Sequence, residues 1–315
     1  MTGSAQTTHV RPGAPLLKWA GGKRQLLPAL RRFYPAAFAR YFEPFVGSGA
    51  VFFDLNSTGR IAGRRVILTD ANPDLIGCYR AVRDEPEPIL ERLDCLARER
   101  AADPVAHFYA TREAFNAARA RLPADAPDRY SPDLAAMLIY LNRTGYNGLF
   151  RLNARGGYNV PAGRYVNPRI SDPALLRAVS ATLARRQVSL AWRPFDSVLG
   201  IARAGDFLYF DPPYAPVSGT SSFTSYTAQR FTLADQARLL DVVIGLADRG
   251  CQVVVSNSSA PAIATLYEDD RRVAAAGLRV HRVPARRAIN SRASARGPVV
   301  EFILTNVPES PQPRD

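Results

Sequence analysis

The spacing of apolar residues predicts an α/β fold with a mostly parallel sheet and a mainly helical insertion. Short apolar runs of strand length alternate with helical patterns, as in proteins whose sheet lies between helices. The predicted strands are 41–45, 66–69, 207–210, 252–255, 278–283 and 299–305. From residue 73 to about residue 186 the strand signal disappears, and an Arg-rich stretch has helical patterns at 87–100, 104–121 and 131–142. We therefore expect a second, inserted domain.

The segment 143–165 differs from the helical patterns before it because it is rich in Gly, Asn, Arg and Tyr. Its residues 154–157, Ala-Arg-Gly-Gly, can turn a hairpin. The insertion is thus expected to carry a β-hairpin. The two ends of the chain, 1–14 and 308–315, are predicted to be flexible tails.

Length and composition limit the class of protein. With 315 residues, 47% of them hydrophobic, the chain can form one large or two modest domains. It has neither an apolar run of the about 18 residues that span a membrane nor the apolar core of a signal peptide, so we expect a cytoplasmic location and no membrane partner. Cys78, Cys95 and Cys251 lie far apart without a histidine at zinc spacing. Reduced thiols and no metal site are expected.

The charge balance suits a polyanionic partner. The formal net charge is +13, and cations that neutralise phosphates release condensed counterions and so drive binding. A basic surface without such a partner explains this charge about equally well. The lysines are more informative, because only Lys18 and Lys23 among 41 basic residues are lysines and they lie close together. Since an arginine fork cannot imitate a compact ammonium, we predict a site there that needs lysine.

The strongest chemical signal is the motif Asp211-Pro212-Pro213-Tyr214, directly after the predicted strand 207–210. Ligands of open α/β sheets bind at the carboxyl ends of strands. The prolines fix the backbone, so the Asp211 carboxylate and the Pro212 carbonyl can both accept hydrogen bonds from one amine. These acceptors free the lone pair of an exocyclic base amine for attack on a methyl group, and Tyr214 can stack on the base. The alternative is a rigid proline turn without chemistry.

A second motif, Glu-Pro-Phe-Val-Gly-Ser-Gly at 43–49, follows the first predicted strand. Its glycines, Gly47 and Gly49, let the backbone approach a ligand closely. An ordinary turn could look the same, but Asp70 ends the next strand, where an acidic side chain commonly binds ribose hydroxyls. Together they predict a nucleoside-containing cofactor. Residues 21–24 lack the first glycine and the Ser or Thr of a phosphate-binding loop, so we reject nucleotide hydrolysis.

The chain resembles the Dam-type (D12 class, group alpha) DNA adenine-N6 methyltransferases in motifs that follow one another at 18–23, 45–49, 70, 143–165 and 211–214. The resemblance spans about residues 15 to 306. It implies a Rossmann-like S-adenosylmethionine methyltransferase sheet with an inserted, mainly helical DNA-recognition domain that carries the β-hairpin. The catalytic domain would comprise residues 15–75 and 187–307, and the target-recognition domain residues 76–186.

The resemblance also implies roles for single residues. The implied cofactor is S-adenosyl-L-methionine, and the residues in contact with it would be Trp19, Lys23, Phe45, Gly47, Gly49, Asp70 and Asp211. The implied partner is double-stranded DNA, and its contacts would be Lys18, Arg143, Tyr146, Asn147, Leu149, Arg151, Asn159, Pro161, Arg164 and Tyr165. The residues implied for catalysis are Asp211, Pro212 and Tyr214. The two clustered lysines would then serve one ligand each.

The target sequence can also be predicted. Positions that meet the bases of GATC in the family are matched by Lys18, Leu149, Arg151 and Pro161. An arginine fork can bind O6 and N7 of guanine together, and apolar groups can pack on the thymine methyl. We therefore expect methylation within GATC after the adenine is flipped out of the duplex, although Arg151 could instead contact a phosphate. Thr144 and Phe150 differ from the best-known members, which leaves the exact target open.

Other functions stay open at this point. Methylation of cytosine N4 needs the same acceptor geometry, although the motif order and the hairpin favour adenine. An RNA or protein methyltransferase shares the cofactor fold. A DNA-binding homologue without catalysis is disfavoured by the intact Asp211. We expect a monomer that acts on the DNA of the nucleoid, with a cognate restriction endonuclease as a candidate partner.

Overall fold

The computed structural model describes residues 15–19, 22–214, 231–286 and 298–310. Its strands are β1 (Arg40–Glu43), β2 (Arg65–Asp70), β3 (Val188–Trp192), β4 (Phe207–Phe210), β5 (Gln252–Ser258), β6 (Arg279–Arg286) and β7 (Pro298–Thr305). Its α-helices are α1 (Leu27–Leu30), α2 (Ala50–Ser57), α3 (Pro73–Asp84), α4 (Pro86–Glu99), α5 (Pro104–Arg119), α6 (Pro132–Thr144), α7 (Pro173–Leu183), α8 (Leu233–Asp248), α9 (Pro261–Ala264) and α10 (Arg271–Ala275). None of these helices is long and apolar enough to cross a membrane. Apart from residues 308–310, the predicted tails lie outside the described residues.

All of these strands form one sheet in the order β3-β2-β1-β4-β5-β7-β6. Pairing from β3 through to β5 is parallel, and β7 runs antiparallel to both β5 and β6. The strand order therefore reverses between β1 and β4, whose carboxyl ends lie side by side. Ligands bind at such a switch point in open α/β sheets. The sheet confirms the predicted fold class.

The sheet is buried on both faces, and β4 shows why its sequence is uninterruptedly apolar. Phe207 and Tyr209 pack into one core together with residues of α2, α3 and α6. The alternate residues Leu208 and Phe210 pack into a second core with α8. Successive side chains of a strand point to opposite faces, so a strand buried on both sides must be apolar throughout.

One strand, β3, was missed by the sequence prediction. Its sequence Val-Ser-Leu-Ala-Trp contains a single buried side chain, Leu190, because the strand lies at the edge of the sheet. Only its parallel pairing with β2 makes it a strand. Short edge strands of this kind give little hydrophobic signal.

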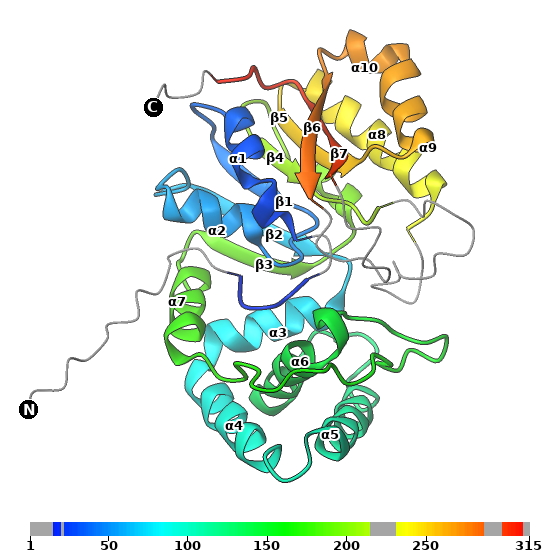
Figure 1. Cartoon of the computed structure of the whole chain (residues 1–315). Coiled ribbons are helices and arrows are strands. Elements are labelled where there is room, and N and C mark those ends of the chain that lie inside the picture. The colour runs from blue at the N-terminus through cyan, green and yellow to red at the C-terminus, as the bar shows by residue number, and fades with distance from the viewer. Residues whose placement is uncertain (1–14, 20–21, 215–230, 287–297, 311–315) are drawn as a thin grey trace, which may run out of the picture.

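The insertion between β2 and β3 is helical, as predicted. Helix α5 begins after Asp103 and α6 after Ser131, whose side chains accept hydrogen bonds from the first-turn amides. Figure 1 shows α4, α5 and α6 gathered below the sheet, with α3 between them and the strands. Helix α3 contacts β2 and β3 as well as α6 and α7. The helices and the sheet thus share one core, and the division at residues 75 and 187 stays a prediction.

The predicted hairpin is present at 145–162, but its pairing is sparse. Two isolated antiparallel bridges join its arms, Gly145 to Ala162 and Leu152 to Tyr158. At the turn, the amide of Asn153 donates to the carbonyl of Gly157 over 2.8 Å. Gly156 has a φ of 76°, which favours glycine. Few ladder bonds hold this hairpin, so its position depends on what packs behind it.

Candidate active site

A pocket opens at the carboxyl ends of β2, β1 and β4, next to the switch in strand order. The predicted site residues that line it are Trp19, Lys23, Phe45, Gly47, Asp70, Asp211, Pro212 and Tyr214. Parallel pairing of β1 with β2 and β4 brings these distant segments together. Gly49 lies behind the pocket, where it precedes α2 with a φ of 67°.

The loop after β1 is held in a conformation that requires glycine at position 47. Gly47 has a φ of 47°, and a Cβ there would lie 3.1 Å from Cδ1 of Trp19. Its amide donates to Oδ2 of Asp70 over 3.1 Å, while the amide of Asn72 donates to Oδ1 over 2.9 Å. Tyr79 donates its hydroxyl to the Gly47 carbonyl. The Asp70 carboxylate is thereby fixed at the pocket edge.

Lys23 connects the lysine-containing segment 18–23 to the Asp211-Pro212-Pro213-Tyr214 motif, which were predicted separately. The side chain is 4% exposed, and its Nζ lies 2.8 Å from Oδ1 of Asp211 and 2.9 Å from the hydroxyl of Tyr214. The second lysine, Lys18, is exposed instead, with its ammonium 4.4 Å from the centroid of the Tyr165 ring. The two lysines therefore face different surroundings.

Side chains of the hairpin point alternately inward and outward. Phe150, Tyr158 and Val160 are buried. Their neighbours in the sequence are more exposed, and they include three of the predicted DNA contacts, Arg151, Asn159 and Pro161. Arg151 donates from Nε to Oδ1 of Asn159 over 2.7 Å, so these two lie together. The alternation of buried and more exposed residues follows the period of two of an extended chain.

The remaining predicted DNA contacts lie in different environments. Tyr146 is 42% exposed, Arg164 is exposed, and Leu149 is partly buried against the core. Asn147 adopts a left-handed φ of 53° between Tyr146 and Gly148. Arg143 donates to the backbone carbonyls of Arg169 and Leu16 over 2.7 and 3.1 Å, so its guanidinium ties chain segments together.

The N-terminal segment, residues 15–19, joins the pocket to the hairpin. The amide side chain of Asn142 accepts from the Lys18 amide over 2.8 Å and donates to the carbonyls of Lys18 and Gly148. Trp19, which follows Lys18 in the chain, stacks on Phe150 with ring centroids 5.7 Å apart. The pocket wall and the hairpin therefore touch.

Comparison with known families agrees with this arrangement. Residues 19–289 match the model of the D12 class N6 adenine-specific DNA methyltransferases. The chain belongs to this family. It is an adenine-specific DNA methyltransferase, and its substrate is DNA.

Three relatives of this methyltransferase align over nearly their whole length. A type II methyltransferase of Lactococcus lactis subsp. cremoris is 37% identical over 93% of this chain and 95% of its own. A type II methyltransferase of Methanocaldococcus jannaschii is 36% identical over 93% and 98%. The DNA adenine methylase of Escherichia coli K12 is 35% identical over 93% and 95%.

Three residues behind the Asp211-Pro212-Pro213-Tyr214 motif, Gln236, Ser256 and Asn257, were not among the predicted site residues. Gln236 of α8, fully buried, donates from Nε2 to the carbonyl of Pro213 over 2.9 Å, and Asn257 donates to its Oε1. Ser256 donates to Oδ1 of Asp211 over 3.3 Å. Gln236 could have been suspected from the sequence, because it lies three residues before Leu239 on the apolar stripe of the helix. These bonds hold the two prolines in place.

Burial controls the charges in the pocket. It raises the pKa of Asp211 to about 6, against the lowering effect of the Lys23 ammonium. It likewise raises the pKa of Asp70 to about 6, against its backbone hydrogen bonds. Both carboxylates are therefore ionised at neutral pH. Burial alone would lower the pKa of Lys23, but Asp211, Tyr214 and Glu301 together raise it above its usual value.

Glu43, which also lines the pocket, behaves differently. It is 2% exposed, and burial raises its pKa to about 8, although the Tyr41 hydroxyl donates to its Oε2 over 2.7 Å. The side chain is therefore mostly protonated at pH 7. The nearby Asp211 and Asp70 carboxylates add to the rise in pKa.

A pH-dependent stability follows from Glu43. Because the folded state raises its pKa from 4.5 to about 8, the folded state binds this proton more tightly than the unfolded state. Its contribution to stability is complete below pH 4.5 and should decline as the pH rises to about 8. Glu43→Gln should flatten this decline when melting temperatures of both proteins are measured from pH 5 to 9. Parallel curves would contradict a neutral Glu43.

Proposed function

We propose that the methyltransferase uses S-adenosylmethionine to methylate adenine N6 within GATC of duplex DNA, and that the adenine leaves the helix to reach Asp211. The observation that carries this is the single pocket shared by the Asp70 loop and the Asp211-Pro212 motif. Methyl donor and acceptor must meet in a fixed geometry, and one continuous pocket allows this.

The walls of the pocket fit the cofactor. Asp70 is ionised and held at the pocket edge by two backbone amides, as a partner of ribose hydroxyls requires. Trp19 and Phe45 supply aromatic surface, and Phe45 is backed by Phe195 at a centroid distance of 5.3 Å. When bound, S-adenosylmethionine supplies an electrophilic methyl group on a sulfonium. Lys23 and Asp211 are the charged groups at the junction of its site with the base.

The catalytic motif can activate the adenine amine without a strong base. Lys23 and Ser256 both contact Oδ1 of Asp211, and Gln236 occupies the carbonyl of Pro213. We assign Oδ2 of Asp211 and the carbonyl of Pro212 as the two acceptors for the amine hydrogens. The nitrogen lone pair is then directed toward the methyl group. Once methylated, the nitrogen is strongly acidic and loses its proton to Asp211 or to solvent.

DNA contact is assigned to the hairpin and the N-terminal segment. Lys18 and Pro161 are exposed, and Arg151 and Asn159 are partly exposed. They lie on segments that also touch the cofactor pocket through Trp19 and Phe150. Enzymes that modify a base inside a duplex extrude it into a pocket, and Tyr214 can stack on the extruded ring. A companion restriction endonuclease stays a prediction, supported by the type II names of two relatives.

The target is tested by sequencing DNA from a host that expresses the protein but has no methylation of its own. We expect N6-methyladenine in every GATC. Methylation in another sequence would overturn GATC but leave the chemistry intact. Purified protein should methylate a GATC duplex only when S-adenosylmethionine is added, and methylation without it would overturn the cofactor assignment.

Arg151→Ala separates reading of a base from contact with a phosphate. If the guanidinium binds a guanine edge, the variant should lose about 1–3 kcal/mol on the cognate duplex and discriminate less at one base pair. The measurement is kcat/KM on the cognate duplex and on duplexes with one altered base pair. Uniform weakening on all duplexes with a shallower salt dependence would assign Arg151 to a phosphate.

A further inference from the structure

The second arm of the hairpin is held on both of its edges. Its odd-numbered carbonyls, those of Gly157, Asn159 and Pro161, accept hydrogen bonds from Asn153, Arg151 and Tyr146 of the preceding arm. Its even-numbered carbonyls accept from α5: Arg112 donates to Val160, Asn116 to Tyr158, and Arg119 to Gly156. Carbonyls of an extended chain alternate between its edges, so α5 takes the place of a neighbouring strand.

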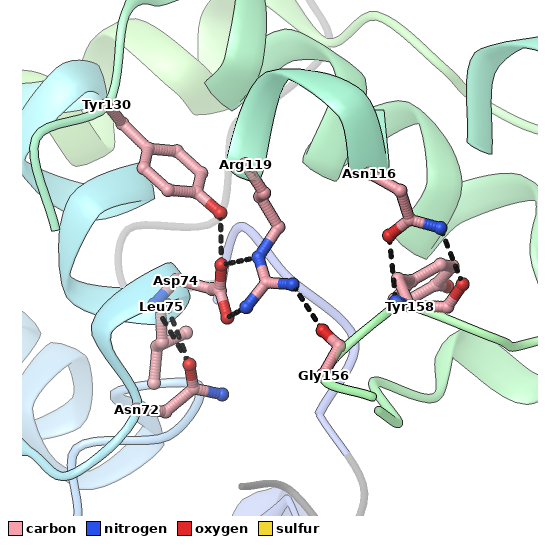
Figure 2. Close-up of polar contacts among 8 residues, drawn as sticks. All are labelled: Asn72, Asp74, Leu75, Asn116, Arg119, Tyr130, Gly156 and Tyr158. Carbon is pink, nitrogen blue, oxygen red and sulfur yellow. Dashed lines mark hydrogen bonds and ion pairs between the residues drawn. The ribbon is translucent and has the colours of Figure 1, made fainter. Parts of the chain in front are cut away.

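The spacing on the helix matches the spacing on the hairpin. Residues 112, 116 and 119 lie on one face of α5 at intervals of four and three, while their partners 160, 158 and 156 follow at intervals of two. Asn116 binds the hairpin as a neighbouring strand would, with one donor and one acceptor on the same residue. Its Nδ2 donates to the Tyr158 carbonyl over 3.0 Å, and its Oδ1 accepts from the Tyr158 amide over 2.8 Å. Figure 2 shows both bonds beside the Arg119 contact.

Arg119 connects this support to the sheet. Its Nε and Nη2 bind the carboxylate of Asp74 in the first turn of α3, and its Nη1 donates to the Gly156 carbonyl over 2.6 Å (Figure 2). Asp74 is 1% exposed and also accepts from the hydroxyl of Tyr130. Helix α3 follows directly on the loop that holds Asp70. The Arg119 guanidinium thus fixes the hairpin turn relative to the loop between Asp70 and helix α3.

We propose that Asn116 and Arg119 are positioning residues for sequence recognition, which hold the second arm in the register that presents its outward side chains to the bases. This rests on the proposed reading of DNA by the hairpin. A hairpin with only two bridges does not hold its own geometry. Side chains that discriminate bases must be held within about 0.5 Å by their supports. Neither residue needs to touch DNA for this role.

Two conservative variants test the positioning role of Asn116 and Arg119. Arg119→Lys keeps a cation for the buried Asp74, but a single ammonium cannot bind both Asp74 oxygens and the Gly156 carbonyl in this geometry. Asn116→Asp keeps the acceptor for the Tyr158 amide and replaces the donor by an oxygen that repels the Tyr158 carbonyl. The matched control is Arg40→Lys, because Arg40 binds the buried Asp206 with Nε and Nη2 and also the Ile201 carbonyl, at the amino ends of the strands.

The measured quantity is the ratio of kcat/KM between the site that the wild type methylates and the same site with one base pair replaced. Both variants should lower this ratio by roughly tenfold, the size of one lost base contact, with cofactor affinity unchanged. Hydrogen exchange should become faster within 151–161 and not elsewhere. Arg40→Lys should leave the ratio at the wild-type value even if its melting temperature falls.

A ratio within the wild-type error for both folded variants would overturn the positioning role. So would equal losses on all duplexes, or faster exchange over the whole chain, since both report general destabilisation. A wild type that methylates DNA without regard to sequence would instead overturn the proposed reading by the hairpin, and the positioning role with it.

Discussion

Asp211→Asn is expected to lower methyl transfer by roughly 10²–10⁴-fold while duplex binding survives, the range found for positioned acid–base groups. In the proposed mechanism, the Asp211 carboxylate acts on the amine of the extruded base and not on phosphates. In the wild type, kcat/KM should fall as the pH drops through about 6, because protonation removes the acceptor charge from Asp211. At saturating S-adenosylmethionine, where protonation of Asp70 does not limit the rate, this acid limb should be absent from the residual activity of the variant. Methyl incorporation from pH 5 to 8 measures both effects.

A matched control separates chemistry from stability. Asp206→Asn removes another buried carboxylate that is paired with an arginine, Arg40, at the opposite end of the strands. It should lower the melting temperature and leave transfer intact, since breaking a buried pair costs stability wherever it lies. Full activity of the Asp211 variant would remove this residue from the mechanism.

Lys23→Arg is expected to weaken S-adenosylmethionine binding by roughly tenfold or more, since overpacking a buried site costs about 1–3 kcal/mol. The Lys23 ammonium lies within hydrogen-bond distance of both Asp211 and Tyr214 in a nearly closed environment. A planar guanidinium keeps the charge but needs more space and a different geometry. Calorimetry with the cofactor measures the change.

Lys18→Arg is the control for this substitution. Lys18 is exposed and lies over Tyr165 rather than in the pocket, so the cofactor affinity of its arginine variant should match the wild type. Equal affinity of the Lys23 variant would mean that the pairing of the two lysines in the sequence has no functional cause.

The sequence predicted the positions of Asp70 and Asp211 relative to the strands. Asp70 ends β2 and Asp211 follows β4, and both signals came from short apolar runs with a polar residue at their end. Gln236 was missed because its task, holding the Pro213 carbonyl, is defined only by a segment 23 residues away. The edge strand β3 was missed because only one of its side chains, Leu190, is buried, so its apolar signal is weak.

The sequence also left the supports of the hairpin undecided. Turn residues at 154–157 predicted a reversal of the chain, but sparse pairing means that the hairpin is positioned by Asn116 and Arg119 of α5. Arg143 shows the same limit. The family resemblance implied that it contacts DNA, and the structure places its guanidinium on two backbone carbonyls.

By itself, the sequence determined the α/β class, the helical insertion, the order of the motifs and the place of Asp211-Pro212-Pro213-Tyr214 directly after a buried strand, because hydrophobic period and backbone-restricting residues are local properties. Only the tertiary structure decided that Lys23 pairs with Asp211 and that Trp19 meets Phe150. It also decided that Glu43 is buried deeply enough to hold its proton. These depend on contacts between residues far apart in the chain, where burial and neighbouring charges set the pKa of each group.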